Sequence, residues 1–531
     1  MTRALLLGLD GATFTLLDPF IAGGVMPFLG SLAEGGARAE LLSTPHPLTP
    51  PAWTTLTTGR TPGNHGIFDF VRVTRTAGRP QFGIATSRDV CCETLWSLAS
   101  RHGRRVTALN FPLTFPPRPL DGYLVPGFLP WRHLRRYVHP PELYEVLRSL
   151  PGFEPSELLL DMDVERESLQ LLPAEEYEPW IRLHIRRERQ WADLAAHLLA
   201  SDPCDLVAVL FDGVDKLQHL CWRFLDPALA PARPTPWEAR VRDLCLEYFR
   251  LLDGHLARLA ALAGPEARLV VASDHGFGPT AEIFYVNAWL QRQGYLAWAD
   301  GAAPDTLGKQ MVEGHRNPVV LFDWNRTTAY ALTAGSNGIY IRTAENGTGP
   351  GVPASGYAAF RDELVRRLRA ATDDQGHPIV ADVLLREVAF AGSETERAPD
   401  LTLVLRDRGF ISVLNSDRVL RPRPAVMGTH HPEGVIVAAG PGVRRGARLD
   451  PLRIEQVTPL LLHALGIPIP ADLDGRFPAA VLDEAALAAD PPRTGPPTLP
   501  PDPFADERAA RVEPEDEEQV LVRLQALGYL E

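Results

Sequence analysis

Acidic and histidine side chains recur along this chain at spacings that suit metal binding. Asp215 and His219 are four residues apart in DGVDKLQH, so on a helix they share one face and both can contact one ion. Asp274 and His275 follow the apolar run RLVVAS, which places a carboxylate and an imidazole together where a strand ends. Each pair alone also has an ordinary structural interpretation, as a solvated helix face or as a capping aspartate beside a core histidine.

Two further positions extend this set of ligand types. Asp10 follows the apolar run ALLLGL, and His430, with His431 beside it, occurs in GTHHPEG. A histidine pair on a loop is unremarkable in isolation. Together, however, carboxylates and imidazoles at several strand ends provide enough ligands for two metal ions. Two ions about 4 Å apart can clamp the attacking and leaving oxygens of a displacement at phosphorus.

Such a centre needs a nucleophile, and the segment TPHPLTPPAWTTLTTG offers Thr49. This threonine precedes Pro50 and Pro51 at the predicted start of a helix. The N-terminus of a helix presents N–H groups and the positive end of the helix dipole, which favour a phosphate there. The commoner role of a threonine before proline is that of an N-cap. From the residues alone, both roles for Thr49 remain open.

The elements that must position these residues can be predicted from short apolar runs typical of parallel strands buried on both faces. The runs occupy residues 4–7, 106–109, 206–211, 269–272 and 435–439. Helical patterns lie between them, so the sequence predicts an α/β fold with a mostly parallel central sheet. Functional sites in such sheets lie at the carboxyl ends of the strands, and Asp10, Asp215 and Asp274 each closely follow a predicted strand.

The chain is expected to form one catalytic domain over residues 1–480, with cap-like insertions at about 74–201 and 284–426. Proline dominates residues 489–503, which predicts a linker. Residues 504–531 form an acidic tail with apolar residues at helical spacing. We expect a short C-terminal helix there, docked on the body or on a neighbouring subunit, which is compatible with a homo-oligomer.

Composition excludes several classes of partner. The chain has 531 residues, 45% hydrophobic content and a net charge of -13, which argues against binding to nucleic acid polymers or to anionic lipid. Its five cysteines lack the spacing of a disulfide framework. We predict neither a signal peptide nor a membrane span, because no apolar run is long enough. The expected protein is a cytoplasmic enzyme acting on a small molecule.

Five motifs follow one another in an informative order, namely LGLDG, TPPAWTTLTTGRTPGNHGI, DxxxH, SDHG and GTHHPEG. With them the chain resembles the alkaline phosphatase superfamily, most closely its type I phosphodiesterase and nucleotide pyrophosphatase branch. The resemblance covers residues 3–475 and implies a three-layer α/β/α core. It also implies a two-metal hydrolase that cleaves a phosphodiester or a nucleotide-like phosphate ester.

The resemblance gives each matching position a role. Thr49 is implied to be the nucleophile, with a covalent phospho-threonine intermediate cleaved by water. The other matching positions are implied ligands of two divalent cations: one ion is held by Asp10, Thr49, Asp274 and His275, and the other by Asp215, His219 and His430. Zinc is the metal that the resemblance implies, and manganese is also compatible because oxygen and nitrogen ligands select weakly between the two.

One feature of the family pattern is missing. In many nucleotide pyrophosphatases an asparagine shortly after the NHGI motif binds the phosphate, whereas here NHGI continues as Phe68, Asp69 and Phe70. Another donor must replace it, since the loss of one such donor costs about 3 kcal/mol in the barrier. The expected candidates are the backbone N–H groups of Ala52 and Trp53, the side chain of Lys216, and groups from the insertions.

Alternatives to a phosphodiesterase remain. The C/S-x-P-x-R signature of sulfatases is absent around Thr49, which disfavours that activity. A phosphomonoesterase, or a phosphotransferase that passes the phosphoryl group to an acceptor alcohol, would use the same residues. A metal-binding scaffold or pseudoenzyme is the alternative from another class. Asn64 and His65 in PGNHGI are expected to be structural, and Trp53 and Trp222 to belong to the core.

Overall fold

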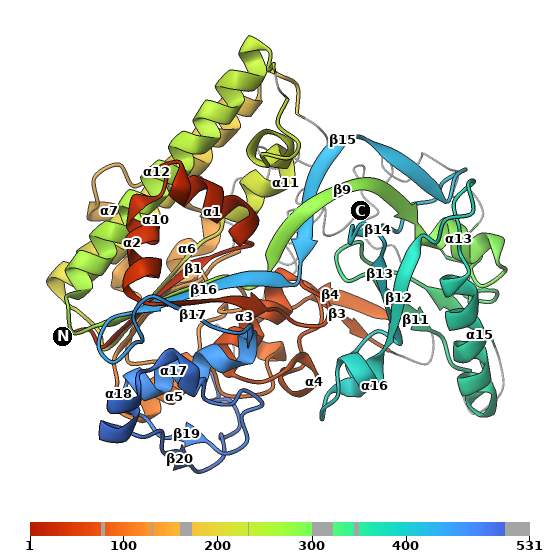
Figure 1. Ribbon diagram of the computed structural model, residues 1–531. Coiled ribbons are helices and arrows are strands. Elements are labelled where there is room, and N and C mark those ends of the chain that lie inside the picture. The colour runs from red at the N-terminus through yellow and green to blue at the C-terminus, as the bar shows by residue number, and fades with distance from the viewer. Residues whose placement is uncertain are drawn as a thin grey trace.

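A nine-stranded sheet crosses the centre of the molecule (Figure 1). The computed structural model describes residues 1–75, 80–128, 131–159, 172–231, 233–299, 322–344 and 350–504. The main path of the sheet runs in the order β17 (Ala447–Arg448), β2 (Ala37–Leu42), β16 (Glu433–Ala439), β8 (Arg268–Ala272), β1 (Ala4–Leu9), β7 (Leu206–Phe211), β5 (Val106–Leu109) and β6 (Gly122–Val125), with β18 (Leu452–Arg453) paired to β2.

Strand β1 lies inside the sheet and pairs in parallel with both β7 and β8. All of its residues are buried. Leu5, Leu7 and Leu9 point to one face and Ala4 and Leu6 to the other, because successive side chains of a strand alternate. Both faces of the strand are buried, so its residues are all apolar instead of alternating between apolar and polar.

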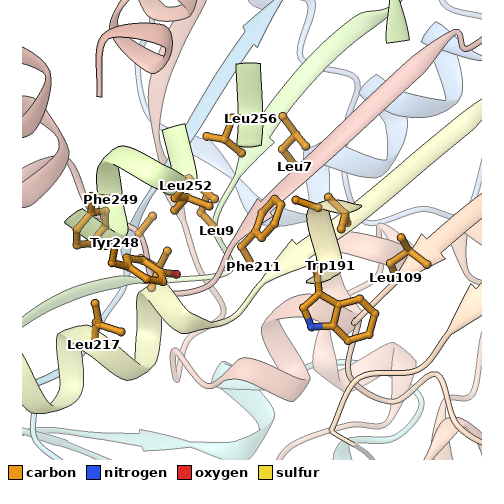
Figure 2. Packing of buried hydrophobic residues seen from close by; sticks show 14 of the residues in the cluster. Leu7, Leu9, Leu109, Trp191, Phe211, Leu217, Tyr248, Phe249, Leu252 and Leu256 are labelled. Atoms are coloured by element: carbon orange, nitrogen blue, oxygen red, sulfur yellow. The ribbon is translucent and has the colours of Figure 1, made fainter. Parts of the chain in front are cut away.

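Helices cover the two faces of the sheet. One layer consists of α1 (Phe14–Ala22), α2 (Pro27–Gly35), α10 (Tyr177–Ser201) and α12 (Pro236–Ala263), and the other of α3 (Thr49–Thr58), α5 (Leu95–Arg101) and α17 (Val457–Ala464). Figure 2 shows the first layer from close by, where Leu256 of α12 lies near Leu7 of β1 and Leu252 near Leu9. The three-layer α/β/α architecture expected from the sequence is therefore confirmed.

The range 74–201 differs from the insertion that was expected there. It supplies strands β5 and β6 to the central sheet and helix α10 to one of the covering layers. The parallel pairing of β5 with both β6 and β7 makes this range part of the core. The run 106–109 was predicted as a strand and is β5, whereas β6 was missed because it is only four residues long and a short buried run gives a weak sequence signal.

A smaller lobe projects from the core on two long antiparallel strands, β9 (Gly276–Tyr285) and β15 (Leu420–His431), which we call the stalk (Figure 1). The lobe, residues 286–419, contains an antiparallel sheet in the order β10 (Ala329–Tyr330), β11 (Gly338–Ile341), β13 (Leu401–Leu405) and β12 (Val380–Leu385), with helices α13 (Val286–Arg292), α15 (Tyr357–Arg369) and α16 (Arg386–Ala389). Its hydrophobic core is separate from those of the central sheet. The lobe lies within the predicted insertion 284–426.

The proline-rich residues 489–503, predicted to be a linker, are hydrogen-bonded to the body. β20 (Thr494–Gly495) pairs with β19 (Ile469–Pro470), and Thr498 donates to Asp472. Beyond them, Phe504 lies under the guanidinium groups of Arg88 and Arg118. The predicted C-terminal helix falls in 505–531, outside the described residues. Among the described residues no single helix is long and apolar enough to cross a membrane; only α1 and α2 together meet those criteria, and they are bent by 103°.

Candidate active site

Side chains from five elements converge at the edge of the central sheet where its parallel strands end. Asp10 follows β1, Asp274 and His275 follow β8, and Asp215 and His219 lie on α11 (Gly213–Leu225), which begins directly after β7. Thr49 opens α3, and His430 lies near the end of β15. We call these residues the polar centre. All of them are buried except His219, which is partly exposed.

The first half of the polar centre surrounds His275 Nε2. This nitrogen lies 3.2 Å from Asp274 Oδ2 and 3.6 Å from Asp10 Oδ1. Thr49 Oγ1 is 3.4 Å away from the same nitrogen. The carboxylates are held by their other oxygens, because the indole N–H of Trp53 donates to Asp10 Oδ2 at 3.2 Å and Gly11 N donates to Asp274 Oδ1 at 3.1 Å.

The second half surrounds Asp215 Oδ1. His430 Nε2 lies 3.1 Å from this oxygen and His219 Nε2 lies 3.5 Å from it. The two imidazole nitrogens are 3.0 Å apart. Asp215 and His219 reach this geometry because they are four residues apart on α11, as their spacing predicts.

The opposite nitrogen of each imidazole contacts a backbone carbonyl. His219 Nδ1 lies 3.1 Å from Gly428 O, His275 Nδ1 lies 3.1 Å from Gly276 O, and His430 Nδ1 lies 2.9 Å from Pro47 O. A carbonyl oxygen can only accept, so Nδ1 carries the proton in each ring. In the neutral ring the lone pair is then on Nε2, which faces the polar centre. This arrangement is typical of histidines that bind metals.

The donor set fits two cations. Asp10 Oδ1 and Asp274 Oδ2 are buried and receive no hydrogen bond from the described residues. In the second half, the Nε2 lone pairs of His219 and His430 face each other and a carboxylate oxygen, an arrangement that repels unless a positive charge lies between them. Ligand atoms close enough to share an ion occur in two groups of described residues, Asp10 with Asp274 and His275, and Asp215 with His275 and His430.

Burial and charge set the pKa values of these groups. Burial, followed by repulsion from Asp274 and Asp215, raises the pKa of Asp10 well above its usual range. Burial likewise raises the pKa of Asp274 and lowers that of His275. Burial would also raise the pKa of Asp215, and only imidazoles that are protonated at His219 and His430 would lower it well below its usual value. Three carboxylates in so small a volume need positive charge nearby to remain ionised together.

Thr49 is the first residue of α3, and the N-cap of this helix is Leu48, without a side-chain cap. The alternative role of Thr49 as an N-cap is therefore wrong, and its hydroxyl lies next to His275 instead.

Two of the expected phosphate donors are otherwise engaged. Ala52 N–H donates to Leu48 O at 3.0 Å, inside the first turn of α3. Lys216 donates to Asp212 at 2.6 Å, and Asp212 also accepts a hydrogen bond from Asn110. Both groups serve structural hydrogen bonds, so the structure does not support them as replacements for the missing asparagine.

Three neighbours named from the motifs have structural contacts. The ring of His431 packs against the backbone of Gly278 instead of facing Asp215. Asn64 donates to Asp474 at 2.8 Å. His65 Nδ1 accepts from Ile67 N, and its Nε2 lies 2.9 Å from Thr55 Oγ1 on α3. Asn64 and His65 thus fix the turn that follows the helix of Thr49.

The sequence did not point to two residues that border the polar centre. His46, three positions before Thr49, contacts Gly335 O from the lobe, and its place in TPHPLTP was the available signal. Phe410 packs against His430, with ring centroids 4.9 Å apart, and nothing in the sequence marks it. The predicted core tryptophans are both buried, but Trp53 also orients Asp10, whereas Trp222 donates to Asp226.

One sequence family matches most of the chain. The sequence profile of the family described as type I phosphodiesterase / nucleotide pyrophosphatase matches residues 4–432, which include the whole polar centre. No curated protein matches the chain.

Solved structures show what the chain resembles in fold. Murine ectonucleotide pyrophosphatase / phosphodiesterase 5, an inactive variant in complex with AMP, is 14% identical over 91% of this chain and 100% of that chain, with a TM-score of 0.51. Phosphonoacetate hydrolase from Sinorhizobium meliloti, in complex with phosphonoformate, is 17% identical over 88% and 95%, with a TM-score of 0.52. Human ectonucleotide pyrophosphatase / phosphodiesterase 5 is 16% identical over 91% and 100%, with a TM-score of 0.50.

Proposed function

Because this chain belongs to the type I phosphodiesterase / nucleotide pyrophosphatase family, we propose that it is a metal-dependent hydrolase of small phosphodiesters with Thr49 as its nucleophile. The observation that carries the proposal is the position of Thr49 Oγ1, buried and 3.4 Å from His275 Nε2 at the edge of a donor set that fits two cations.

Each residue of the polar centre has a role in this proposal. Asp10, Thr49, Asp274 and His275 would hold one divalent ion, and Asp215, His219 and His430 the other. Bound zinc or manganese would lower the pKa of the threonine hydroxyl and offset the charge that develops on the phosphoryl group. The backbone carbonyls at Nδ1 fix the tautomer of each imidazole and hold its Nε2 towards the centre.

The reaction then proceeds in two displacements. Thr49 Oγ1 attacks phosphorus, so that an Oγ1–P bond forms while the ester bond to the leaving alcohol breaks. Water subsequently cleaves the phospho-threonine and restores the hydroxyl. Thr49 opens α3, so the positive end of the helix dipole favours the phosphoryl group at this position. Burial of the surrounding carboxylates limits the access of bulk water during the first step.

The test compares the metal-loaded protein with Thr49→Ala on a bis-aryl phosphodiester, an aryl phosphomonoester and an aryl sulfate. We expect the parent to prefer the diester and the variant to lose roughly 10³-fold or more in kcat, as enzymes that lose a nucleophile do. Thr57→Ala is the matched control, since Thr57 lies on the same helix and its hydroxyl donates to Trp53 O.

Other results of this assay would indicate a different function or refute the role of Thr49. A parent that prefers the monoester would be a phosphatase, and one that transfers the phosphoryl group to an added alcohol rather than to water would be a phosphotransferase. Unchanged turnover in Thr49→Ala would refute the nucleophile. No turnover of any ester with zinc or manganese would favour a metal-binding scaffold.

A further inference from the structure

The lobe brings an aromatic ring to the polar centre. The ring of Phe410 lies edge-on to that of His430, with an interplanar angle of 77°. Its centroid is 6.4 Å from the ring of His219 and 6.3 Å from that of His46. Phe410 is only partly buried although it packs against the large hydrophobic cluster. A partly exposed apolar surface thus adjoins the half of the polar centre formed by Asp215, His219 and His430.

The backbone around Phe410 is fixed from both sides by one amide. Asn337 Nδ2 donates to Gly409 O at 3.2 Å, and Asn337 Oδ1 accepts from Ile411 N at 2.9 Å. These bonds hold the residue before Phe410 and the residue after it. Asn337 has a φ of 48° and is buried, and asparagine is among the few residues that tolerate this left-handed conformation.

A second anchor ties the same loop to the stalk. Asp407 Oδ2 accepts hydrogen bonds from Thr280 Oγ1 at 2.8 Å and from the N–H groups of Ala281 and Glu282 at 3.1 Å each. Its other oxygen accepts from Gly409 N at 3.0 Å. Since Thr280 belongs to β9, the loop that carries Phe410 cannot shift without breaking bonds to the strand that begins beside His275.

These contacts give Phe410 the properties of a specificity residue. It is apolar, partly exposed, held by bonds to the backbone on both sides, and adjacent to two imidazoles of the polar centre. We propose that Phe410 determines substrate preference by contacting an aromatic or similarly flat apolar substituent of the phosphate ester, and that Asn337 positions it. This inference rests on the proposed function, and it specifies which class of ester that function serves.

The test measures the binding of phenylphosphonate and methylphosphonate to the zinc-loaded protein by calorimetry. Neither probe has an ester bond to cleave, so binding is observed apart from turnover. We expect the parent to bind phenylphosphonate more tightly, and Phe410→Ala to reduce this preference by about 3- to 10-fold, the range of an aromatic contact. Phe410→Tyr should retain the preference, Phe410→Leu should lose part of it, and methylphosphonate should bind all variants equally.

Two variants separate position from stability. Asn337→Ala should reduce the preference for phenylphosphonate without changing the affinity for methylphosphonate, because the ring remains but is no longer held in place. Phe360→Ala is the matched control: Phe360 is also a partly buried phenylalanine of the lobe, but it lies on α15 and contacts Tyr295. It should keep the preference of the parent.

The outcomes distinguish the two proposals. If methylphosphonate binds and the preference for phenylphosphonate is the same in the parent and in Phe410→Ala, the role of Phe410 is refuted and the proposed function stands. If neither phosphonate binds the zinc-loaded parent, the role of Phe410 and the proposed function are both refuted.

Discussion

Asp69 follows the NHGI motif, close to the position where the family resemblance led us to expect a phosphate-binding asparagine, yet its carboxylate faces the lobe. It accepts hydrogen bonds from Thr333 Oγ1 at 2.5 Å and from Phe70 N at 2.6 Å. Burial raises the pKa of Asp69 from 3.8 to about 7. The residue therefore joins the core to the loop that contains Gly335, the partner of His46, instead of serving the polar centre directly.

A pH-dependent stability follows from this carboxyl group. Its pKa is raised on folding, so the stability it contributes is fully present below pH 3.8 and is lost as the pH rises through about 7. Asp69→Asn cannot ionise, and it should gain on the order of 2 kcal/mol relative to the parent between pH 5 and pH 8. Urea unfolding at the two pH values measures this. The control is Asp374→Asn, which changes an exposed aspartate and should show no such gain. The prediction is contradicted if the stability difference between Asp69→Asn and the parent does not change with pH.

The Asp and His residues of the polar centre could be predicted from the sequence, because each of them follows a predicted strand or lies one helical turn from another such residue. Choosing His430 over His431 required the family resemblance, since alternation along β15 separates them and the sequence does not reveal which face is inward. The indole bond from Trp53 to Asp10 and the contact of Phe410 with His430 join residues far apart in the chain. Such contacts depend on packing, which no local pattern encodes.

At the scale of elements, helix α11 has an unusual N-terminus. Its N-cap residue, Asp212, makes no side-chain cap because its carboxylate accepts from Lys216 and Asn110. Glu188 of α10 takes over this role: its Oε1 accepts from Gly213 N at 2.7 Å and from Tyr248 OH at 2.9 Å. A carboxyl group from a neighbouring helix thus fixes the first turn of the helix that carries Asp215.

Removing this cap should destabilise the protein. Glu188→Ala leaves Gly213 N–H and Tyr248 OH without their buried acceptor and should cost about 1–2 kcal/mol of the free energy of unfolding. Burial, and then repulsion by Asp212, raises the pKa of Glu188 to about 8, so its neutral form predominates at pH 7. Glu188→Gln mimics that form and should cost much less. Denaturant unfolding of the two variants checks this, and equal losses would show that the charge, not the cap, matters.

At the scale of the whole molecule, the polar centre joins parts that have separate hydrophobic cores. Strands β1 and β8 and helices α3 and α11 contribute from the body, and β15 contributes His430 from the stalk of the lobe. The parallel strands of the body were predictable, because burial on both faces makes them continuously apolar. The extent of the lobe was suggested by the sequence, but its antiparallel sheet was not, since β10 has only two residues and β11 only four.

Metal binding at a junction of this kind should stabilise the entire fold. At a free zinc concentration 100 times the dissociation constant, one site adds about 2.7 kcal/mol to the stability, so a chelator should lower the melting temperature and zinc should restore it. His430→Ala should reduce the response to zinc, whereas His431→Ala should keep it, because His431 packs against Gly278. A melting temperature that is insensitive to both chelator and zinc would speak against the metal sites.

The stalk also affects how the lobe can change in evolution. Because β9 and β15 are neighbours in register, with Phe277 opposite His430, the chain leaves the body and returns to it at almost the same point. The segment between the two strands could therefore be replaced by another during evolution without altering the body. The exchange has one constraint: Asp274 and His275 are encoded before the segment and His430 after it. Any transplanted segment must preserve the alignment of its two ends, or His430 is separated from the other residues of the polar centre.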